Sequence, residues 1–138
     1  MVKVLQDIWI LKEESGIVVF HRVFDEELDV QLFGGLMSAL NSFAEQLSKE
    51  GISSFELSNK RFTLLKREGL LFVASSDNDE KIKKVQRELK RISDKFFEIY
   101  PPEILENWDS DISMFKDFKE EIEESLEETV KKFQKAFW

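Results

Sequence analysis

The segment from Leu70 to Asp79 places the strongest constraint on the fold of this chain. It reads LLFVASSDND: an apolar run, two serines and a group of Asp and Asn residues, followed directly by a charged helical pattern from Glu80. A strand that is apolar at every position is covered on both of its faces. The segment therefore predicts a central strand of a sheet with helices on both sides.

Length and composition predict one globular domain with a short extension. The chain has 138 residues, of which 42% are apolar and 35% charged, and its 13 Phe favour an aromatic core. The absence of Cys suits a reducing compartment and excludes a disulfide framework. The N-terminus shows no signal-peptide cleavage site, and no apolar run is long enough to cross a bilayer. We expect a cytoplasmic protein that reaches membranes only through its partners.

The charge distribution favours protein partners over nucleic acid. The formal net charge is -8, whereas phosphate binding requires a concentrated basic stripe. The helical pattern from Asp79 to about Tyr100 is rich in Lys and Arg, but Glu88, Asp94 and Glu98 interrupt them. We interpret this pattern as a solvated helix face rather than an anionic binding surface.

Periodicity and turn residues predict the element order ββαβββαα. Strands are expected at Val2–Leu11, Ile17–Phe24, Ser53–Leu57, Arg61–Lys66 and Leu70–Ala74. Helices are expected from the cap Asp29 to about Lys49, from Asp79 to about Tyr100, and from Asp111 to Trp138. The first and fifth strands belong at the centre, with their hairpin partners outside them. The predicted fold class is α+β, a five-stranded antiparallel sheet with helices on both faces.

The first helix carries an apolar stripe that we expect to face the sheet, formed by Leu32, Leu36, Leu40, Phe43 and Leu47. Small and polar residues lie away from this stripe, and two Gly inside a helix cost about 1 kcal/mol each relative to Ala. Either the glycines form a tolerated kink or allow a close contact between helix and sheet, or they form a shallow outer groove where another helix or backbone approaches closely. On the second interpretation the candidate partner-binding residues are Gly34, Gly35, Ser38 and Asn41.

The final helix continues its apolar stripe beyond what one domain requires. Residues 1–118 suffice for the domain, and residues 119–138 form a C-terminal amphipathic extension continuous with the last helix. An exposed stripe of this length is expected to fold back on the domain or to pair with a partner helix. This adds Phe133, Phe137 and Trp138 to the candidate partner-binding residues.

Residues able to carry out chemistry are few. His21 is the single His, and no nucleophile or metal-binding set accompanies it in the sequence. The Asx residues from Asp77 to Asp79 lack the spacing of a calcium loop and suit a turn or a helix cap. The glycines form no phosphate-binding loop. We predict no catalytic residue, no cofactor and no metal.

Three stretches resemble longin domains. The stretch IWILKEESGIVVFHRVF resembles the opening hairpin of that family. The stretch LLFVASSDNDEKIKKVQRELKRISDKFF is similar to the corresponding strand, loop and helix of clathrin-adaptor and coatomer small and medium subunits, and ILENWDSDISMFKDF resembles the join to their final helix. The resemblance covers Val2 to Phe118, and the chain departs from adaptor subunits beyond about Lys119. A short Lys- and Glu-rich version of this kind would suit an archaeal relative.

The resemblance implies a noncatalytic interaction module of the SNARE-like superfamily. Such domains act as platforms in vesicle trafficking and small-GTPase regulation. The partners it implies are a small GTPase, a subunit of a trafficking complex, a helix of another longin or SNARE-like protein, or a second copy of the chain. Two alternatives from other classes stay open: a small αβα enzyme, and a regulatory domain that is inhibited by its own final helix.

Overall fold

The computed structural model describes residues 5–22, 29–49, 53–56, 60–106, 115, 117 and 118. Its elements follow the predicted order, with one short helix added after the second long one. They are β1 (Asp7–Lys12), β2 (Val18–Arg22), α1 (Val30–Leu47), β3 (Ser54–Glu56), β4 (Lys60–Arg67), β5 (Leu70–Asp77), α2 (Ile82–Ile99) and α3 (Pro102–Glu106). Apart from residues 115, 117 and 118, the predicted helix Asp111–Trp138 lies outside the described residues.

The strands form a single antiparallel sheet in the order β2-β1-β5-β4-β3, which confirms the predicted arrangement. β1 and β5 pair along their length at the centre, with Trp9 opposite Val73. Every residue of β5 except the last, Asp77, is buried, as its uninterrupted apolar run requires. The β4–β5 hairpin turns tightly through Glu68 and Gly69, both at positive φ, a conformation typical of two-residue hairpin turns.

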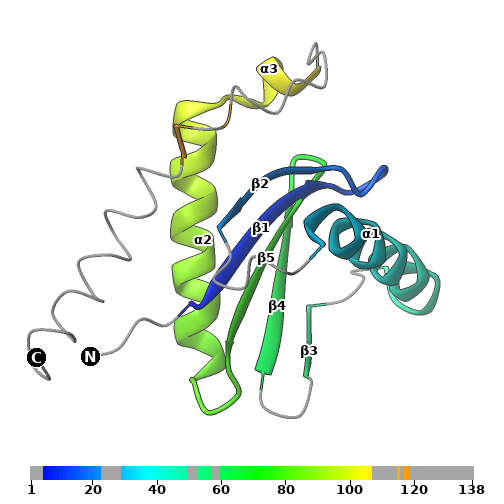
Figure 1. Cartoon of the computed structure of the whole chain (residues 1–138), viewed down its shortest axis with the longest axis vertical. Coiled ribbons are helices and arrows are strands. Elements are labelled where there is room, and N and C mark those ends of the chain that lie inside the picture. Colours follow the sequence, from blue (N-terminus) through cyan, green and yellow to red (C-terminus); the bar gives the residue numbers. More distant parts are fainter. Residues whose placement is uncertain are drawn as a thin grey trace, which may run out of the picture.

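Helix α2 covers one face of the sheet and closes the larger core (Figure 1). Its apolar positions recur at helical spacing, so Val85, Leu89 and Phe96 all point inward and are fully buried. Burying each such side chain stabilises the fold by about 1.5–3 kcal/mol. Phe115 and Phe118 pack against Phe96 in the same core, with ring centroids 5.6 and 5.1 Å away.

The N-terminal end of α2 differs from the expected bound, whereas the C-terminal end agrees with it. The helix begins at Ile82, after the cap position Lys81, and not at Asp79, because the residues from Asp77 to Glu80 form a turn. It ends at Ile99, as the following prolines predict. Pro102 then opens the short helix α3, where a missing backbone N–H costs nothing.

Helix α1 lies on the opposite face from α2 (Figure 1), and its orientation corrects the expectation from sequence. The predicted core stripe turns outward, apart from the partly buried Leu40. The face of α1 that meets the rest of the domain is mixed: Gly34, Ser38 and Asn41 are buried there together with Met37, and Val30, Phe33 and Leu40 are partly buried at its sides. The expectation that Leu32, Leu36, Phe43 and Leu47 face the sheet is therefore wrong, whereas Phe33 and Met37, expected beside that stripe, do lie toward the core.

Candidate protein-interaction surface

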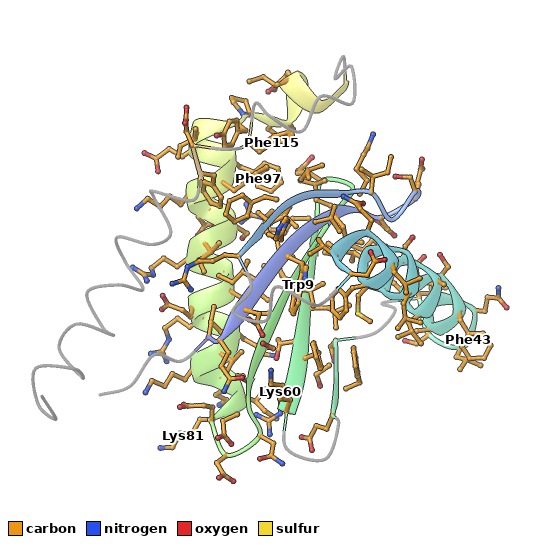
Figure 2. All side chains as sticks on the ribbon, viewed as in Figure 1. Trp9, Phe43, Lys60, Lys81, Phe97 and Phe115 are labelled. Atoms are coloured by element: carbon orange, nitrogen blue, oxygen red, sulfur yellow. The ribbon has the colours of Figure 1, made fainter. Side chains whose placement is uncertain are left out.

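The outward face of α1 is a row of large apolar side chains in solvent. Leu32 is 71% exposed, Leu36 55%, Phe43 62% and Leu47 78%, and we call these four residues the outer stripe. At about 100° per residue they fall on one side of the helix, opposite the buried Gly34 and Asn41. Figure 2 shows Phe43 pointing away from the sheet at the far end of the helix.

A contact between two glycines holds α1 in this orientation. Gly34 lies against Gly16 in the β1–β2 turn, so that a Cβ built on Gly34 would be 2.4 Å from the Gly16 carbonyl oxygen. The same Cβ would be 2.5 Å from Cγ2 of Val18. Gly16 has a φ of +76°, which also favours glycine. Of the two interpretations of Gly34 that the sequence left open, the close contact between helix and sheet is therefore the one observed.

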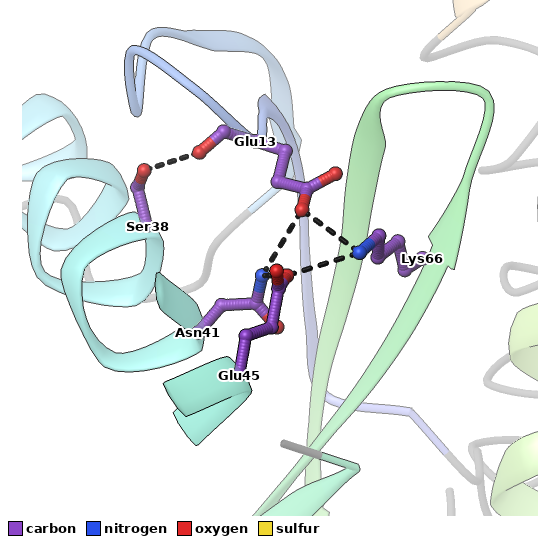
Figure 3. A network of polar contacts seen from close by, with 5 residues as sticks. All are labelled: Glu13, Ser38, Asn41, Glu45 and Lys66. Carbon is purple, nitrogen blue, oxygen red and sulfur yellow. Dashed lines mark hydrogen bonds and ion pairs between the residues drawn. The ribbon is translucent and has the colours of Figure 1, made fainter. Parts of the chain in front are cut away.

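Polar side chains complete the attachment of α1 (Figure 3). The hydroxyl of Ser38 donates to the backbone oxygen of Glu13, and Nδ2 of Asn41 donates to Oε1 of Glu13 at 3.3 Å and to Oε1 of Glu45 at 2.7 Å. The Nζ atom of Lys66 lies 3.0 Å from each of the two carboxylates. We call these five residues the polar anchor. They join the β1–β2 turn, α1 and β4.

The charges of the polar anchor shift one another's proton affinities. The hydrogen bond with Lys66 is the main cause that holds the pKa of Glu45 below its ordinary value. Hydrogen bonding with Glu13 and Asn41 lowers this pKa further. Hydrogen bonds to Glu45 and then Glu13 raise the pKa of Lys66. Both shifts favour the charged forms, so the ion pairs persist at neutral pH.

Ser38 and Asn41, two of the predicted partner-binding residues, belong to the polar anchor. Ser38 and Asn41 are buried, as is Gly34, so the expectation that these three form an outer groove is wrong. Gly35 is exposed, with nothing within 4 Å of its Cβ position, and its role in binding stays a prediction. Phe133, Phe137 and Trp138 lie outside the described residues, and their role likewise stays a prediction.

An aromatic cluster runs from the centre of the sheet to its β3 edge. Trp9 stacks on Phe33 of α1 with centroids 4.2 Å apart, and Phe33 lies 5.8 Å from Phe62 of β4. Phe62 stacks in turn on Phe55 of β3 at 4.9 Å. Phe55 is only partly buried. The apolar surface beneath α1 therefore continues to the edge strand.

The two edges of the sheet differ. At β3, Ser54 and Glu56 are exposed, and no described segment pairs with the outer side of the strand. At β2, the side chain of Gln31 occupies the outer side of Val18 through two hydrogen bonds. The β3 edge is thus open to strand addition in the described part of the chain.

A family model described as the first longin domain of FUZ, MON1 and HPS1 matches residues 7–105. The chain belongs to this longin family. The match spans both long helices and all five strands, including α1 and the β3 edge. No curated protein sequence matches this longin domain.

Solved structures show the same fold at low sequence identity. Myxococcus xanthus MglB has a TM-score of 0.56 and 14% identity, over 70% of this chain and 77% of that chain. The gliding protein MglB of Thermus thermophilus has a TM-score of 0.54 and 14% identity, over 63% and 71% of the two chains. A Roadblock/LC7 domain from Streptomyces avermitilis has a TM-score of 0.54 and 14% identity, over 70% and 88%.

The Asx residues from Asp77 to Asp79 and the single His of the longin domain lie in a turn and on a strand. Oδ1 of Asp77 accepts from the backbone N–H of Asp79, and Arg61 donates to the carbonyl oxygens of Asn78 and Glu80. This loop is a turn held by Arg61. His21 lies exposed on β2. Across the described ranges, no three His, Cys, Asp or Glu residues are grouped so as to hold a metal ion.

Of the helices that the structure describes, none combines the length and the apolar character needed to span a bilayer. The large apolar side chains of the outer stripe belong to a helix whose buried face holds Gly34, Ser38 and Asn41 beside Met37. Among the described residues, the two surfaces open to a partner are therefore the outer stripe of α1 and the edge of β3.

Proposed function

We propose that this longin domain is a noncatalytic interaction module in small-GTPase regulation or membrane trafficking, and that its partner binds the outer stripe of α1 and the edge of β3. The observation that carries the proposal is the exposure of four leucine and phenylalanine side chains on one helix face. Contiguous apolar surface of this kind marks protein interaction sites in folded proteins.

The cost of the orientation of α1 supports the same conclusion. Turning the leucines inward would bury more apolar area, and each fully buried side chain of this size contributes about 1.5–3 kcal/mol. The chain instead places Gly34, Ser38 and Asn41 inside beside Met37, and specific contacts fix Gly34 and Ser38 there. A partner that covers the outer stripe recovers this free energy on binding.

The shape of the surface limits the kind of partner. An amphipathic helix can lie along the outer stripe, and a strand can add to β3 through backbone hydrogen bonds. A small GTPase, a trafficking-complex subunit or another longin or SNARE-like protein can supply these elements. A second copy of the chain supplies both at once, and one related solved structure is described as MglB with a tetrameric arrangement.

The ionisable groups of the described residues favour binding over catalysis. An enzyme active site brings titratable groups together around a position for substrate. Here the group that comes together is the polar anchor, whose members bond to one another and to the β1–β2 turn. We propose that its role is to hold α1, which leaves the outer stripe as the working surface.

The test is Phe43→Asp in the full chain, with Ile104→Asp as the control. Both residues are exposed, Phe43 on the outer stripe and Ile104 on α3. Sedimentation equilibrium of the chain alone and titration with small GTPases of the same genome, loaded with GDP or a GTP analogue, measure the two kinds of association. Loss of a central anchor of an interface costs about 1–3 kcal/mol, so Phe43→Asp should weaken binding by about tenfold to a hundredfold. Equal behaviour of the two variants in both assays contradicts the proposal.

A further inference from the structure

We propose that the side chain of Gln31 closes the β2 edge of the sheet and thereby restricts strand addition to the β3 edge. This inference goes beyond the proposed function, because it concerns the edge that the partner does not use. It assigns a specificity role to a residue of α1 that lies outside the outer stripe.

The geometry is that of a strand substitute. The backbone N–H of Val18 donates to Oε1 of Gln31 at 3.0 Å, and the carbonyl oxygen of Val18 accepts from Nε2 of Gln31 at 3.2 Å. A neighbouring antiparallel strand makes the same two bonds with one residue of its partner. A carboxamide carries one acceptor and donors in a planar group, so it can copy a peptide unit. The Val18 backbone is thus already paired on the outer side of β2.

The position of Gln31 follows from the attachment of α1. Gln31 lies in the first turn of the helix, which Asp29 caps by accepting from the N–H of Leu32 at 3.0 Å. One turn later, Gly34 meets Gly16 and the side chain of Val18. The contact at Gly34 and the two hydrogen bonds of Gln31 therefore both involve Val18. The close approach of the helix at Gly34 brings the side chain of Gln31 within reach of the Val18 backbone.

The β3 edge has no equivalent device in the described structure. Ser54 and Glu56 are exposed, and the side chain of Glu56 accepts from Arg61 of its own neighbour β4. An open edge of this kind accepts another strand. Within the described part of the chain, the β2 edge is therefore blocked at Val18 and the β3 edge is available.

This asymmetry decides what kind of assembly can form. With two open edges, β2 of one molecule can pair with β3 of the next, and such a head-to-tail contact grows into an open chain. With β2 plugged, strand pairing between copies is limited to β3 with β3, which is complete at two molecules. Pairing with a different protein is limited to β3 in the same way.

The first measurement is amide hydrogen exchange at Val18 in Gln31→Ala, with Gln46→Ala as the matched control. Gln46 is an exposed glutamine of the same helix, away from β2. Loss of a typical hydrogen bond should speed exchange at Val18 by about two- to tenfold in Gln31→Ala. Gln46→Ala should leave it unchanged. Unchanged exchange in Gln31→Ala overturns the proposal, since the plug would then not exist in solution.

The second measurement is association through β2. The chain contains no Cys, so Ile17→Cys places a single pyrene label beside Val18, at a side chain that is 37% exposed. We expect Gln31→Ala to show pyrene excimer emission that rises with concentration, together with a growing sedimentation coefficient. Gln31→Glu keeps an acceptor but loses the donor to the carbonyl oxygen of Val18, and should show a smaller gain.

The outcomes separate this inference from the proposed function. Faster exchange at Val18 without new excimer emission overturns the proposal, because an unplugged edge would then recruit nothing. The proposed function is tested by Phe43→Asp, whose readouts involve neither Val18 nor the label at Ile17. Excimer emission in Gln31→Ala supports the plug even if Phe43→Asp leaves all association unchanged.

Discussion

Gly34 of α1 and Gly16 of the β1–β2 turn touch through their backbones, so closely that a methyl group on Gly34 would lie 2.4 Å from the carbonyl oxygen of Gly16. The neighbouring Gly35 has nothing within 4 Å of its own Cβ position. The backbone of Gly35 also lies near Gly16, but a side chain added at Gly35 would meet open space and one added at Gly34 would not, so substitution can separate the two positions.

We predict that Gly34→Ala destabilises the domain by about 1–3 kcal/mol, because the backbone of the turn must move to admit the methyl group. Gly35→Ala should stabilise it by about 0.5–1 kcal/mol, because alanine favours the helix and meets no obstacle. Urea unfolding followed by circular dichroism gives both values. An equal gain in stability for the two variants would show that α1 does not approach Gly16 as described.

The polar anchor should make the stability of the domain fall at both low and high pH. The pKa of Glu45 is lowered in the folded state, so its contribution is present above the unfolded-state pKa of about 4.3 and is lost as pH falls through the lower folded value. The pKa of Lys66 is raised, so its contribution is present below about 10.4 and is lost as pH rises through the raised folded value.

Lys66→Met tests whether the ion pairs of the polar anchor stabilise the domain between these two pKa values. We expect the urea midpoint of Lys66→Met to fall below that of the wild type between about pH 5 and 9 and the difference to shrink below about pH 4. Added salt should narrow the difference because the pair is partly exposed. Lys83→Met, at an exposed lysine on the outer side of α2, is the control and should show no such pH dependence. A difference independent of pH would mean that packing by the Lys66 stem, and not its charge, matters.

Truncation of two phenylalanines to alanine should change the free energy of unfolding by very different amounts. Phe96 is fully buried and its ring lies 5.7 Å from Phe72 and 5.1 Å from Phe118, so Phe96→Ala should cost about 3–5 kcal/mol. Phe43 is 62% exposed, and Phe43→Ala should change the unfolding free energy of the isolated domain by less than about 0.5 kcal/mol. Thermal and urea unfolding at low protein concentration give both numbers. A large loss at Phe43 under these conditions would place the outer stripe in the core.

The C-terminal boundary of the domain is expected to lie just after Phe118. This residue is fully buried, with its ring 5.2 Å from Phe20 and 5.1 Å from Phe96. A chain that ends at Lys119 should keep a cooperative unfolding transition, whereas one that ends at residue 114 loses two buried rings and several kcal/mol. We also expect removal of residues 120–138 to change association or dye binding, since it removes the apolar stripe that includes Phe133 and Phe137. Unaltered sedimentation, dye binding and partner binding would make residues 120–138 a passive tail.

The sheet could be predicted from sequence because its signals are local. The apolar run of Leu70–Ala74 requires burial on both faces, and the glycine-containing turn at Glu68 and Gly69 fixes the neighbouring hairpin. The inward face of α2 was equally readable, since its apolar and charged positions separate cleanly. These elements are determined mainly by residues close to one another in the chain.

The orientation of α1 could not be predicted in the same way. Periodicity shows that a helix has two faces but does not say which one meets the sheet when contacts distant in sequence decide it. Here Gly16, Glu13 and Lys66 come from other segments, and they select the face that carries the small and polar residues. The signal available in advance was the pairing of Gly34 with Ser38 one turn later, because small residues at this spacing permit close backbone approach. Gln31 carried no signal, since its partner is a backbone group of β2.

The contacts that attach α1 to the sheet do not involve the residues of the outer stripe. Because Gly34, Ser38 and Asn41 hold the helix, Leu32, Leu36, Phe43 and Leu47 can be exchanged without disturbing what keeps the helix in place. If a partner binds the outer stripe as proposed, substitutions there can change which partner is bound while the contacts that hold the helix stay the same. On the proposed function, recognition and folding are encoded on separate sides of one helix.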